Sequence, residues 1–312
     1  MKIIFFGSDD FAVTNLEALI QSEHEVVACV TQPDRAKGRG LKIEPSVIKQ
    51  CAQKQGITVF QPENLKDDRF IRQLKNYNCD LFVVIAYGKI LPPELLQIPY
   101  VCAMNVHASL LPKYRGAAPI NWVIINGEKE TGVSIIKMNA QMDAGDIFAQ
   151  AKIKIEEQDT AITLKAKLAQ ISAKLLISTI NSLEKNAYTL TVQDNHAMTY
   201  APKLTKEMGL IDWSKKAIEI HNLVRGLLPW PTAYTFFKRK LLKILETQVT
   251  PLDLKSYQPG EVIQIVKSGF IVVTGDQALL IKKVHLEASR LMEANHFVLG
   301  HSIKRGFSFS IH

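Results

Sequence analysis

The 312-residue sequence lacks the patterns of several common classes of protein. No apolar run approaches the eighteen or more residues of a membrane span, and the apolar start KIIFF turns polar too soon for the core of a signal peptide. Four cysteines, at least 22 residues apart, match neither a CxxC zinc motif nor a small disulfide scaffold, and the eight histidines show no HxH or HxxxH pairing. We therefore expect a cytoplasmic protein with no membrane partner and no metal. Buried, reduced thiols are expected at Cys29, Cys79 and Cys102.

Two enzyme fingerprints are also missing. The GxGxxG motif of dinucleotide-binding domains is absent, which argues against a nicotinamide or flavin cofactor. Ser109 stands two residues after His107, but no G-x-S-x-G elbow surrounds a serine, so a hydrolase of that class is not indicated.

The formal net charge of +8 is distributed unevenly along the chain. Residues 206–312 hold 15 Lys and Arg against 9 Asp and Glu, whereas residues 1–205 hold 23 against 21. A basic final third is typical of a surface that meets a polyanion such as nucleic acid. A generic basic surface that favours solubility is an equally good explanation of the charge alone.

The first thirty residues predict a parallel α/β fold. KIIFF (residues 2–6) and EVVACVT (25–31) are apolar runs typical of buried strands, and residues 11–21 between them carry apolar side chains at helical spacing. A strand, a helix and a second strand in this order form a βαβ unit. Such a unit implies a parallel sheet with helices on its faces.

The rest of the chain predicts an extension of this sheet and then a second domain. We expect a short helix after Pro92 and a long helix at 160–185 with Thr160 as its N-cap. Residues 186–209 are polar and lack periodicity, so we divide the chain into a first domain at 1–186, a linker at 187–208 and a second domain at 209–312. Further strands are expected at 80–88, 101–107, 131–138 and 146–155, the last alternating as an antiparallel strand or an edge strand would.

The second domain predicts a different architecture. A helix near 214–226 precedes several short strand-like stretches that are separated by Pro-Gly, Ser-Gly and Thr-Gly-Asp turns. This pattern indicates a small antiparallel β-barrel or sandwich.

An amide and an imidazole end one of the predicted central strands, in the stretch NVHASLLPKYRGAAP (105–119). Asn105 and His107 alternate with apolar residues, so both side chains point to the same face. Ligands of parallel sheets bind outside the carboxyl ends of the strands. Two hydrogen-bond donors at this edge suit a reaction in which negative charge gathers on an oxygen. Pro112 would hold the following loop in shape.

Asp143, in the Gly-containing loop MDAGD, is the candidate carboxylate partner of His107. A nearby carboxylate would favour the charged imidazole and could accept a proton from an amine. The alternative for each residue is structural: a turn-forming asparagine, a half-buried histidine with satisfied hydrogen bonds, and a solvated loop aspartate.

These stretches together resemble the folate-dependent formyltransferases, in which Asn, His and Asp form the catalytic trio. The resemblance extends over nearly the whole chain and is strongest to the members that act on methionyl-tRNA. It departs from the family at Ala108 and Ala144 and in the first turn, which lacks an expected proline. The motifs that carry it are NVHASLLPKYRGAAP, MDAGD, TQPDRAKGRG (31–40), AYGKILP (86–92), MTYAPKL (198–204), IDWS (211–214) and PWP (229–231).

The resemblance implies both an activity and a set of site residues. The implied reaction transfers the formyl group from 10-formyltetrahydrofolate to the α-amino group of methionyl-initiator tRNA, for translation initiation. The implied fold is a Rossmann-like catalytic domain with a mostly parallel sheet, followed by a small OB-like β-barrel domain that binds tRNA, and we expect a monomer. The implied catalytic residues are Asn105, His107 and Asp143. Folate contacts are implied for Ser109, Leu110, Leu111, Pro112, Ala86, Tyr87, Gly88, Ile90 and Leu91, and tRNA contacts for Arg35, Lys37, Arg39 and Lys42.

Three alternatives remain open at this point. Formyltransferases that act on glycinamide ribonucleotide share the trio but are shorter and lack a basic second domain. Those that act on sugar nucleotides share the SLLP loop and a small second domain, although the stretch PDRAKGRG and the basic final third suit a polyphosphate chain better. A nucleic-acid-binding protein without activity would leave the trio a coincidence.

Overall fold

The computed structural model describes residues 1–37, 42–251 and 257–309, and the chain divides into two compact units. The second unit includes two segments from the middle of the chain, so neither unit is one continuous stretch of sequence. The first unit comprises Met1–Pro119, Glu130–Lys154 and Lys165–Pro202, and the second comprises Ile120–Lys129, Ile155–Leu164 and Lys203–His312.

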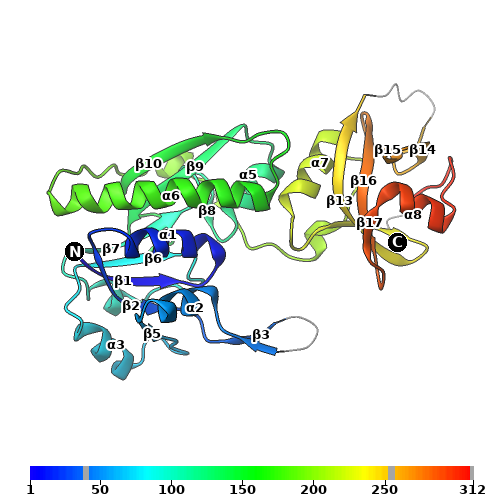
Figure 1. The fold of residues 1–312 in the computed structure, drawn as a ribbon. Helices are drawn as coiled ribbons and strands as arrows, with labels where there is room; N and C mark the ends of the chain where they lie inside the picture. The colour runs from blue at the N-terminus through cyan, green and yellow to red at the C-terminus, as the bar shows by residue number, and fades with distance from the viewer. Residues whose placement is uncertain (38–41, 252–256, 310–312) are drawn as a thin grey trace. The chain divides into compact units, whose positions relative to one another are not determined.

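A seven-stranded sheet forms the centre of the first unit, with the order β10-β9-β7-β6-β1-β2-β5 (Figure 1). The five strands from β7 to β5 run parallel, and β9 is antiparallel to both of its neighbours. The expected mostly parallel sheet with an antiparallel edge strand is therefore confirmed. The strands are β1 (Lys2–Gly7), β2 (Glu25–Val30), β5 (Thr58–Phe60), β6 (Leu81–Ile85), β7 (Cys102–His107), β9 (Glu130–Lys137) and β10 (Ile147–Lys154).

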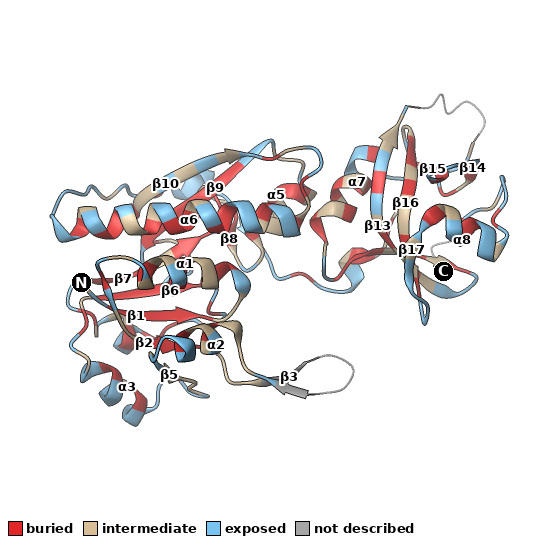
Figure 2. Cartoon of the chain, in the orientation of Figure 1, coloured by how far each residue is buried: buried red, intermediate tan, exposed pale blue. Residues whose placement is uncertain are grey.

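The central strands β1 and β6 are buried apart from the first residue of β1, as Figure 2 shows. Ile4 and Phe6 of β1 belong to one apolar cluster with Phe70 and Leu95, which come from helices α3 (Asp68–Lys75) and α4 (Pro93–Leu96). Successive strand side chains alternate between faces, so the other side chains of β1 point to the opposite side of the sheet. A continuous apolar strand thus buries both of its faces.

Two helices begin directly after a residue whose side chain caps them. Helix α1 (Asp10–Ile20) begins after Asp9, whose carboxylate accepts a hydrogen bond from the Phe11 N–H at 2.9 Å. Helix α6 (Ala161–Glu184) begins after Thr160, whose hydroxyl accepts one from the Thr163 N–H at 3.2 Å, as expected for an N-cap. The two helices are joined by a buried hydrogen bond from Asn15 to Ser172, at 2.8 Å.

The second unit is built on an antiparallel sheet with the order β12-β13-β16-β15-β14, as expected for an OB-like domain, and β17 pairs with β16. Its apolar core joins residues of all the long strands to helices α7 and α8. The elements are α5 (Pro119–Ile125), α7 (Ala217–Gly226), β12 (Ala233–Phe237), β13 (Lys240–Thr250), β14 (Val262–Val266), β15 (Gly269–Val273), β16 (Ala278–Leu286), β17 (Leu291–Glu293) and α8 (Ala294–His301).

Several boundaries differ from the sequence prediction for local reasons. Helix α7 starts at Ala217 instead of 214, because Asp212 folds back on the Ser214 N–H at 3.0 Å and forms a turn. The strand expected at 80–88 ends at Ile85, because Ala86 adopts a φ of 45°. Elements that the sequence did not lead us to expect include helix α2 (Val47–Lys54), the hairpin of β3 (Arg35–Lys37) and β4 (Lys42–Glu44), and the short pair of β8 (Arg115–Gly116) and β11 (Tyr200–Ala201).

The cysteines are free thiols, and Cys29, Cys79 and Cys102 are buried as expected. Burial raises the pKa of the Cys29 thiol to about 12 and those of Cys79 and Cys102 to about 11, so the thiolate forms that react are disfavoured.

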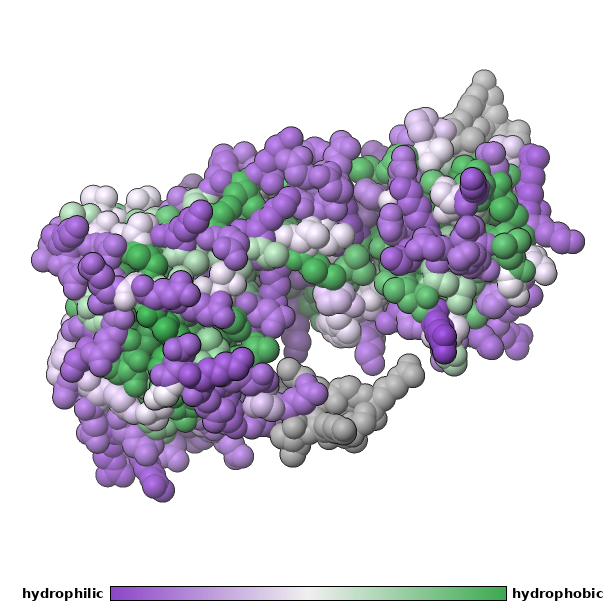
Figure 3. Space-filling model, in the orientation of Figure 1, coloured by the Kyte–Doolittle hydropathy of each residue, from purple (hydrophilic) through white to green (hydrophobic). Residues whose placement is uncertain are grey.

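Much of the surface visible in Figure 3 is hydrophilic. Over the stretches that the structure describes, no helix has both the length and the apolar character that crossing a membrane requires.

Candidate active site

Asn105 and His107 lie at the carboxyl end of β7 and face the same side, as the alternation predicts. Strand β7 lies between β6, which is parallel to it, and β9, which is antiparallel. His107 is buried, with 5% of its surface exposed, whereas Asn105 is half-buried. The edge of the sheet therefore holds both groups in fixed positions.

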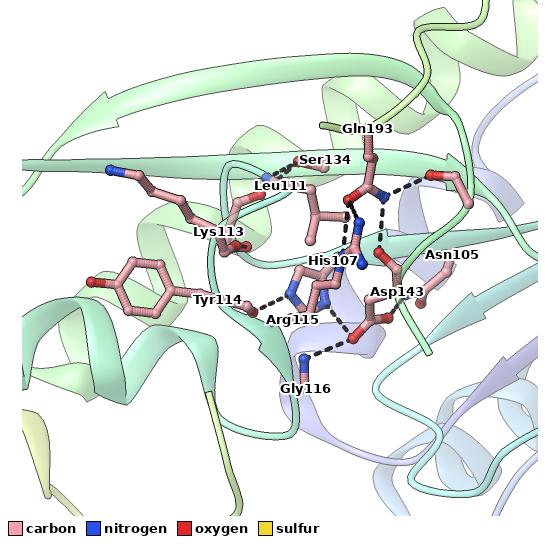
Figure 4. A network of polar contacts seen from close by, with 12 residues as sticks. Asn105, His107, Leu111, Lys113, Tyr114, Arg115, Gly116, Ser134, Asp143 and Gln193 are labelled. Atoms are coloured by element: carbon pink, nitrogen blue, oxygen red, sulfur yellow. Dashed lines mark hydrogen bonds and ion pairs between the residues drawn. The ribbon is translucent and has the colours of Figure 1, made fainter. Parts of the chain in front are cut away.

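Asp143 lies in the loop between β9 and β10 and contacts both residues (Figure 4). One carboxylate oxygen accepts a hydrogen bond from the Asn105 amide at 3.1 Å. The other lies 3.5 Å from Nδ1 of His107 and accepts a hydrogen bond from the Gly116 N–H at 2.9 Å. The three residues that the resemblance singles out are thus brought together.

The two ring nitrogens of His107 both face oxygen atoms of the protein. Nε2 lies 2.8 Å from the carbonyl oxygen of Tyr114, and Nδ1 faces the carboxylate of Asp143. A carbonyl oxygen only accepts hydrogen bonds, so Nε2 is the donor in that contact. The ring that carries a hydrogen on both nitrogens satisfies both acceptors. Donation to a substrate oxygen would require the ring to exchange one of these partners.

The Asp143 loop has a special backbone conformation. Asp143 itself has a φ of 52°, in the left-handed region that few non-glycine residues adopt. Gly145 follows closely, and a Cβ atom at this position would lie 1.7 Å from the carbonyl oxygen of Lys137. The loop therefore packs against the end of β9 in a way that only glycine permits.

Two residues that the sequence analysis did not single out support this loop. The Gln193 side chain donates hydrogen bonds to the carbonyl oxygens of Asp143, at 2.8 Å, and of Gly145, at 2.7 Å. Its own oxygen accepts two from the guanidinium of Arg115, at 3.1 and 2.7 Å. Arg115 stands inside the quoted signature, so the motif was a signal for it. Gln193 has none, because it lies in the polar stretch that predicts a linker.

The Ser109–Pro112 loop, which the resemblance assigns to folate, is held by hydrogen bonds from the sheet. The Ser134 hydroxyl donates to the carbonyl oxygen of Ser109 at 2.7 Å and accepts from the Leu111 N–H at 3.0 Å. Gln150 donates to the carbonyl oxygen of Leu111 at 2.9 Å. Its shape thus depends on strands β9 and β10 as well as on Pro112.

The Ala86–Leu91 segment follows β6 and so begins at the same edge of the sheet as Asn105. Tyr87 and Leu91 are buried, while Ala86, Gly88 and Ile90 are exposed, Ile90 to 74%. The Tyr87 ring packs edge-on against Phe6, and burial raises the pKa of its hydroxyl to about 12. The segment therefore exposes the apolar side chain of Ile90, while the buried Tyr87 and Leu91 hold it against the core.

The candidate tRNA-binding residues fall largely outside what the structure describes. Arg39 lies outside the described residues, as do the side chains of Arg35, Lys37 and Lys42, although the backbone of these three forms the β3–β4 hairpin. Directly before this hairpin, Asp34 accepts hydrogen bonds from Lys49 and Gln61. These two bonds lower the pKa of the Asp34 carboxyl.

Within the described ranges, no three or more His, Cys, Asp or Glu side chains form a group that could hold a metal ion.

Two family models match the chain. The model described as formyl transferase matches residues 1–180, and the model described as formyl transferase, C-terminal domain, matches residues 203–302. The methionyl-tRNA formyltransferase of Caldanaerobacter subterraneus subsp. tengcongensis is 46% identical over 307 residues, which cover 98% of this chain and 99% of that protein. That of Alkaliphilus oremlandii is 44% identical over 306 residues, 98% of each chain.

Solved structures with lower sequence identity share the fold. The sugar 3N-formyltransferase WlaRD, solved with dTDP and 5-N-formyl-THF, aligns with a TM-score of 0.67 and 20% identity over 93% of this chain and 99% of that one. HypX from Aquifex aeolicus in complex with tetrahydrofolic acid aligns with a TM-score of 0.66 and 17% identity over 96% of this chain. The present chain covers 47% of HypX, about half of its length.

Proposed function

The chain belongs to the formyl transferase family, with methionyl-tRNA formyltransferases as full-length relatives, and we propose that it transfers the formyl group of 10-formyltetrahydrofolate to the α-amino group of methionyl-initiator tRNA. The choice of acceptor is supported by the contrast in sequence identity: 44–46% over nearly the full length to methionyl-tRNA formyltransferases, and 20% to a sugar N-formyltransferase of similar fold. The product is the formylated initiator of translation.

The observation that carries the proposal is the convergence of Asn105, His107 and Asp143 at one strand end. Attack of a neutral amine on the formyl carbon forms a C–N bond and turns the formyl oxygen into an oxyanion. The Asn105 amide has two N–H groups, and Asp143 accepts one of them. The other can donate to the oxyanion, and preorganised donors of this kind typically contribute about 10²–10³ in rate.

In this proposal, His107 stabilises the negative charge of the oxyanion and Asp143 transfers the proton. A doubly protonated His107, held by Tyr114 and Asp143, places a positive charge beside the oxyanion. The amine must lose a proton as the carbon–N10 bond of the folate breaks, and N10 must gain one. We assign this transfer to the carboxylate of Asp143, acting through water.

We propose that the folate binds between the Ser109–Pro112 loop and the Ala86–Leu91 segment. Both begin at the carboxyl ends of neighbouring parallel strands, which is where ligands of such sheets bind. The largely buried loop of the first and the exposed Ile90 of the second suit a flat, partly apolar ring. HypX, with a similar fold, binds tetrahydrofolic acid.

For the tRNA we propose two contact regions. One is the basic segment that contains Arg35, Lys37, Arg39 and Lys42. The other is the domain at residues 209–312, which the linker at 187–208 joins to the catalytic domain at 1–186. The excess of Lys and Arg in residues 206–312 supports the second. Because initiator tRNA is used in translation, we place the protein in the cytoplasm, and we propose a monomer because one chain supplies the whole trio.

The test is a formyl-transfer assay with 10-formyltetrahydrofolate and three acceptors: charged initiator tRNA, charged elongator tRNA and a sugar-nucleotide amine. We expect rapid formylation of the methionine on initiator tRNA and little of the other two. Formylation of the sugar-nucleotide amine alone would instead assign the protein to the sugar-acting enzymes. Binding of tRNA without any formylated product would make it a binding protein.

A further inference from the structure

The stretch from Thr191 to Ala201 was expected from its sequence to be part of a linker. It instead contacts the loops that surround the catalytic trio. At its start, Thr191 forms a pair of backbone hydrogen bonds with Ile147, at 2.8 and 2.9 Å, just after the Asp143 loop. At its end, Tyr200 and Ala201 pair with Arg115 and Gly116 as parallel strands. This stretch, here called the strap, is therefore anchored on both sides of the site.

Near its start, the strap holds the loop that carries Asp143, the carboxylate of the trio. Gln193 is buried, with 5% of its surface exposed, and its amide makes two donated and two accepted hydrogen bonds. Both donated bonds hold carbonyl oxygens of the Asp143 loop, at Asp143 and at Gly145. A side-chain amide has two N–H groups, so the donor capacity of Gln193 is used entirely on this loop.

Near its end, the strap holds the backbone segment that His107 contacts. The Thr199 hydroxyl accepts a hydrogen bond from the Tyr114 N–H at 2.9 Å, and the Thr199 carbonyl oxygen accepts one from the Arg115 N–H at 2.9 Å. Tyr114 has a φ of 63°, and its carbonyl oxygen is the partner of His107. The strap thus supports an uncommon backbone conformation that aims an acceptor at the imidazole ring.

From these contacts we propose that the strap positions the catalytic trio, and that Gln193 is a positioning residue which acts on the reaction through Asp143. Arg115 is the support beneath it, since its buried guanidinium donates to Gln193 and to Asn195. Catalytic groups need such support, because a displacement of about 1 Å can lower the rate about 100-fold. The inference rests on the proposed function, in that the trio carries the formyl transfer.

The decisive variant is Gln193→Glu. It preserves the size of the side chain and its oxygen acceptor for Arg115, but replaces the donor to the two loop carbonyls with an oxygen. We expect kcat to fall roughly 10- to 100-fold, with KM for both substrates changed less than about threefold. The matched control is Val192→Ala, at a neighbouring position whose side chain is exposed to 77% and makes none of these hydrogen bonds. It should keep kcat within about threefold of the wild type.

A double variant separates positioning from general damage. In an Asp143→Ala background, Gln193→Glu should lower kcat by less than about twofold more, because Gln193 acts through the residue already removed. A full additional loss of activity in that background would overturn the proposal. An unchanged kcat in Gln193→Glu itself would overturn it equally.

A measurement without substrates keeps the inference separate from the proposed function. Hydrogen exchange at the Gly116 amide, which donates to Asp143, and in the peptide spanning residues 138–147 should be faster in Gln193→Glu and unchanged in Val192→Ala. If the wild type formylates no methionyl-tRNA, the proposed function fails, whereas the exchange rates still decide whether the strap holds the loop. Equal exchange in wild type and Gln193→Glu would overturn the inference.

Discussion

The amide nitrogen of Asn105 and a carboxylate oxygen of Asp143 are 3.1 Å apart, although 38 residues separate them in the chain. This bond orients the Asn105 amide, because it fixes which end carries the N–H groups. Among the contacts described for Asn105, the second N–H has no protein partner, so it is the group that a substrate oxygen can meet. Catalysis in the proposed reaction depends on this one orientation.

The first prediction concerns that donor. Asn105→Ala should lower kcat about 10²- to 10³-fold, because the oxyanion loses its preorganised partner, while KM for folate and for tRNA stays within about threefold. Single-turnover formylation of methionyl-tRNA measures the chemical step directly.

His107→Ala should lower kcat by about two orders of magnitude or more as well, with nearly unchanged tRNA binding. If either variant turned over like the wild type, the catalytic assignment of that residue would be wrong. A rise in KM alone, with kcat unchanged, would assign the residue to substrate binding instead.

A second prediction concerns the backbone that carries Asp143. A Cβ atom on Gly145 would lie 1.7 Å from the Lys137 carbonyl oxygen, so Gly145→Ala must displace the loop. We expect the free energy of unfolding to fall by about 1–3 kcal/mol, as for an overpacked site, and kcat to fall at least about 10-fold in the folded protein. Urea unfolding and steady-state formylation measure the two effects.

Gly300→Ala is the matched control for this variant. Gly300 lies in helix α8, and an added Cβ there meets nothing within 4 Å. Alanine is the better helix former by up to about 1 kcal/mol, so this variant should be equally stable or more stable, with normal activity. Wild-type kcat in Gly145→Ala would show that the loop conformation is not needed for the reaction.

How far the sequence predicts the structure depends on the length of each pattern. Strands β1 and β6 are predictable because each buries several consecutive apolar residues, and α1 and α6 because they join an apolar periodicity to a capping side chain. The two-residue pair of β8 and β11 is not predictable, because two residues show no period and their partners are far apart in the chain.

The same limit applies to the candidate site. Asn105 and His107 are predictable as a pair, since the alternation of a strand places them on one face. Their contact with Asp143 follows from the family resemblance and not from spacing. Gln193 was missed because its role is set by two backbone carbonyl groups of another loop, which leave no mark on the sequence around it.

A third prediction concerns pH. Burial, and then the neighbouring Arg225 guanidinium, lower the pKa of His221 below its ordinary value of 6.5. Between the folded pKa and 6.5, the unfolded chain binds a proton that the folded chain does not. The free energy of unfolding should therefore decrease as the pH falls below about 6.5, until the folded pKa is passed.

His221→Gln removes the titration while keeping a polar side chain near the Thr247 hydroxyl, which lies 2.8 Å from Nδ1. Urea unfolding at pH 7 and pH 5 should show a smaller loss of stability for this variant than for the wild type. An equal or larger loss in the variant would contradict the assignment of the effect to His221.

The last prediction concerns a basic turn in the second unit. Strands β12 and β13 are joined by Lys238 and Arg239, with φ angles of 48° and 65°. A two-residue turn with positive φ at both positions is of type I′, which strongly prefers Asn-Gly. Two long basic side chains therefore stand where each costs about 1–2 kcal/mol in backbone strain. From strain at an exposed basic turn we expect that these charges serve binding more than folding.

Replacing the turn by Lys238→Asn and Arg239→Gly should thus have opposite effects on stability and on binding. We expect the free energy of unfolding to rise by about 1–2 kcal/mol and the affinity for methionyl-tRNA to fall. The slope of log affinity against log salt should become shallower by about 0.7–0.9 for each tRNA phosphate that the variant no longer neutralises.

Lys304→Asn with Arg305→Gly is the matched control, since it removes the same charge from two exposed positions without positive φ. If both pairs weakened binding equally, net charge alone would explain the affinity. If the turn variant were more stable and bound tRNA as the wild type does, the turn would not contact tRNA.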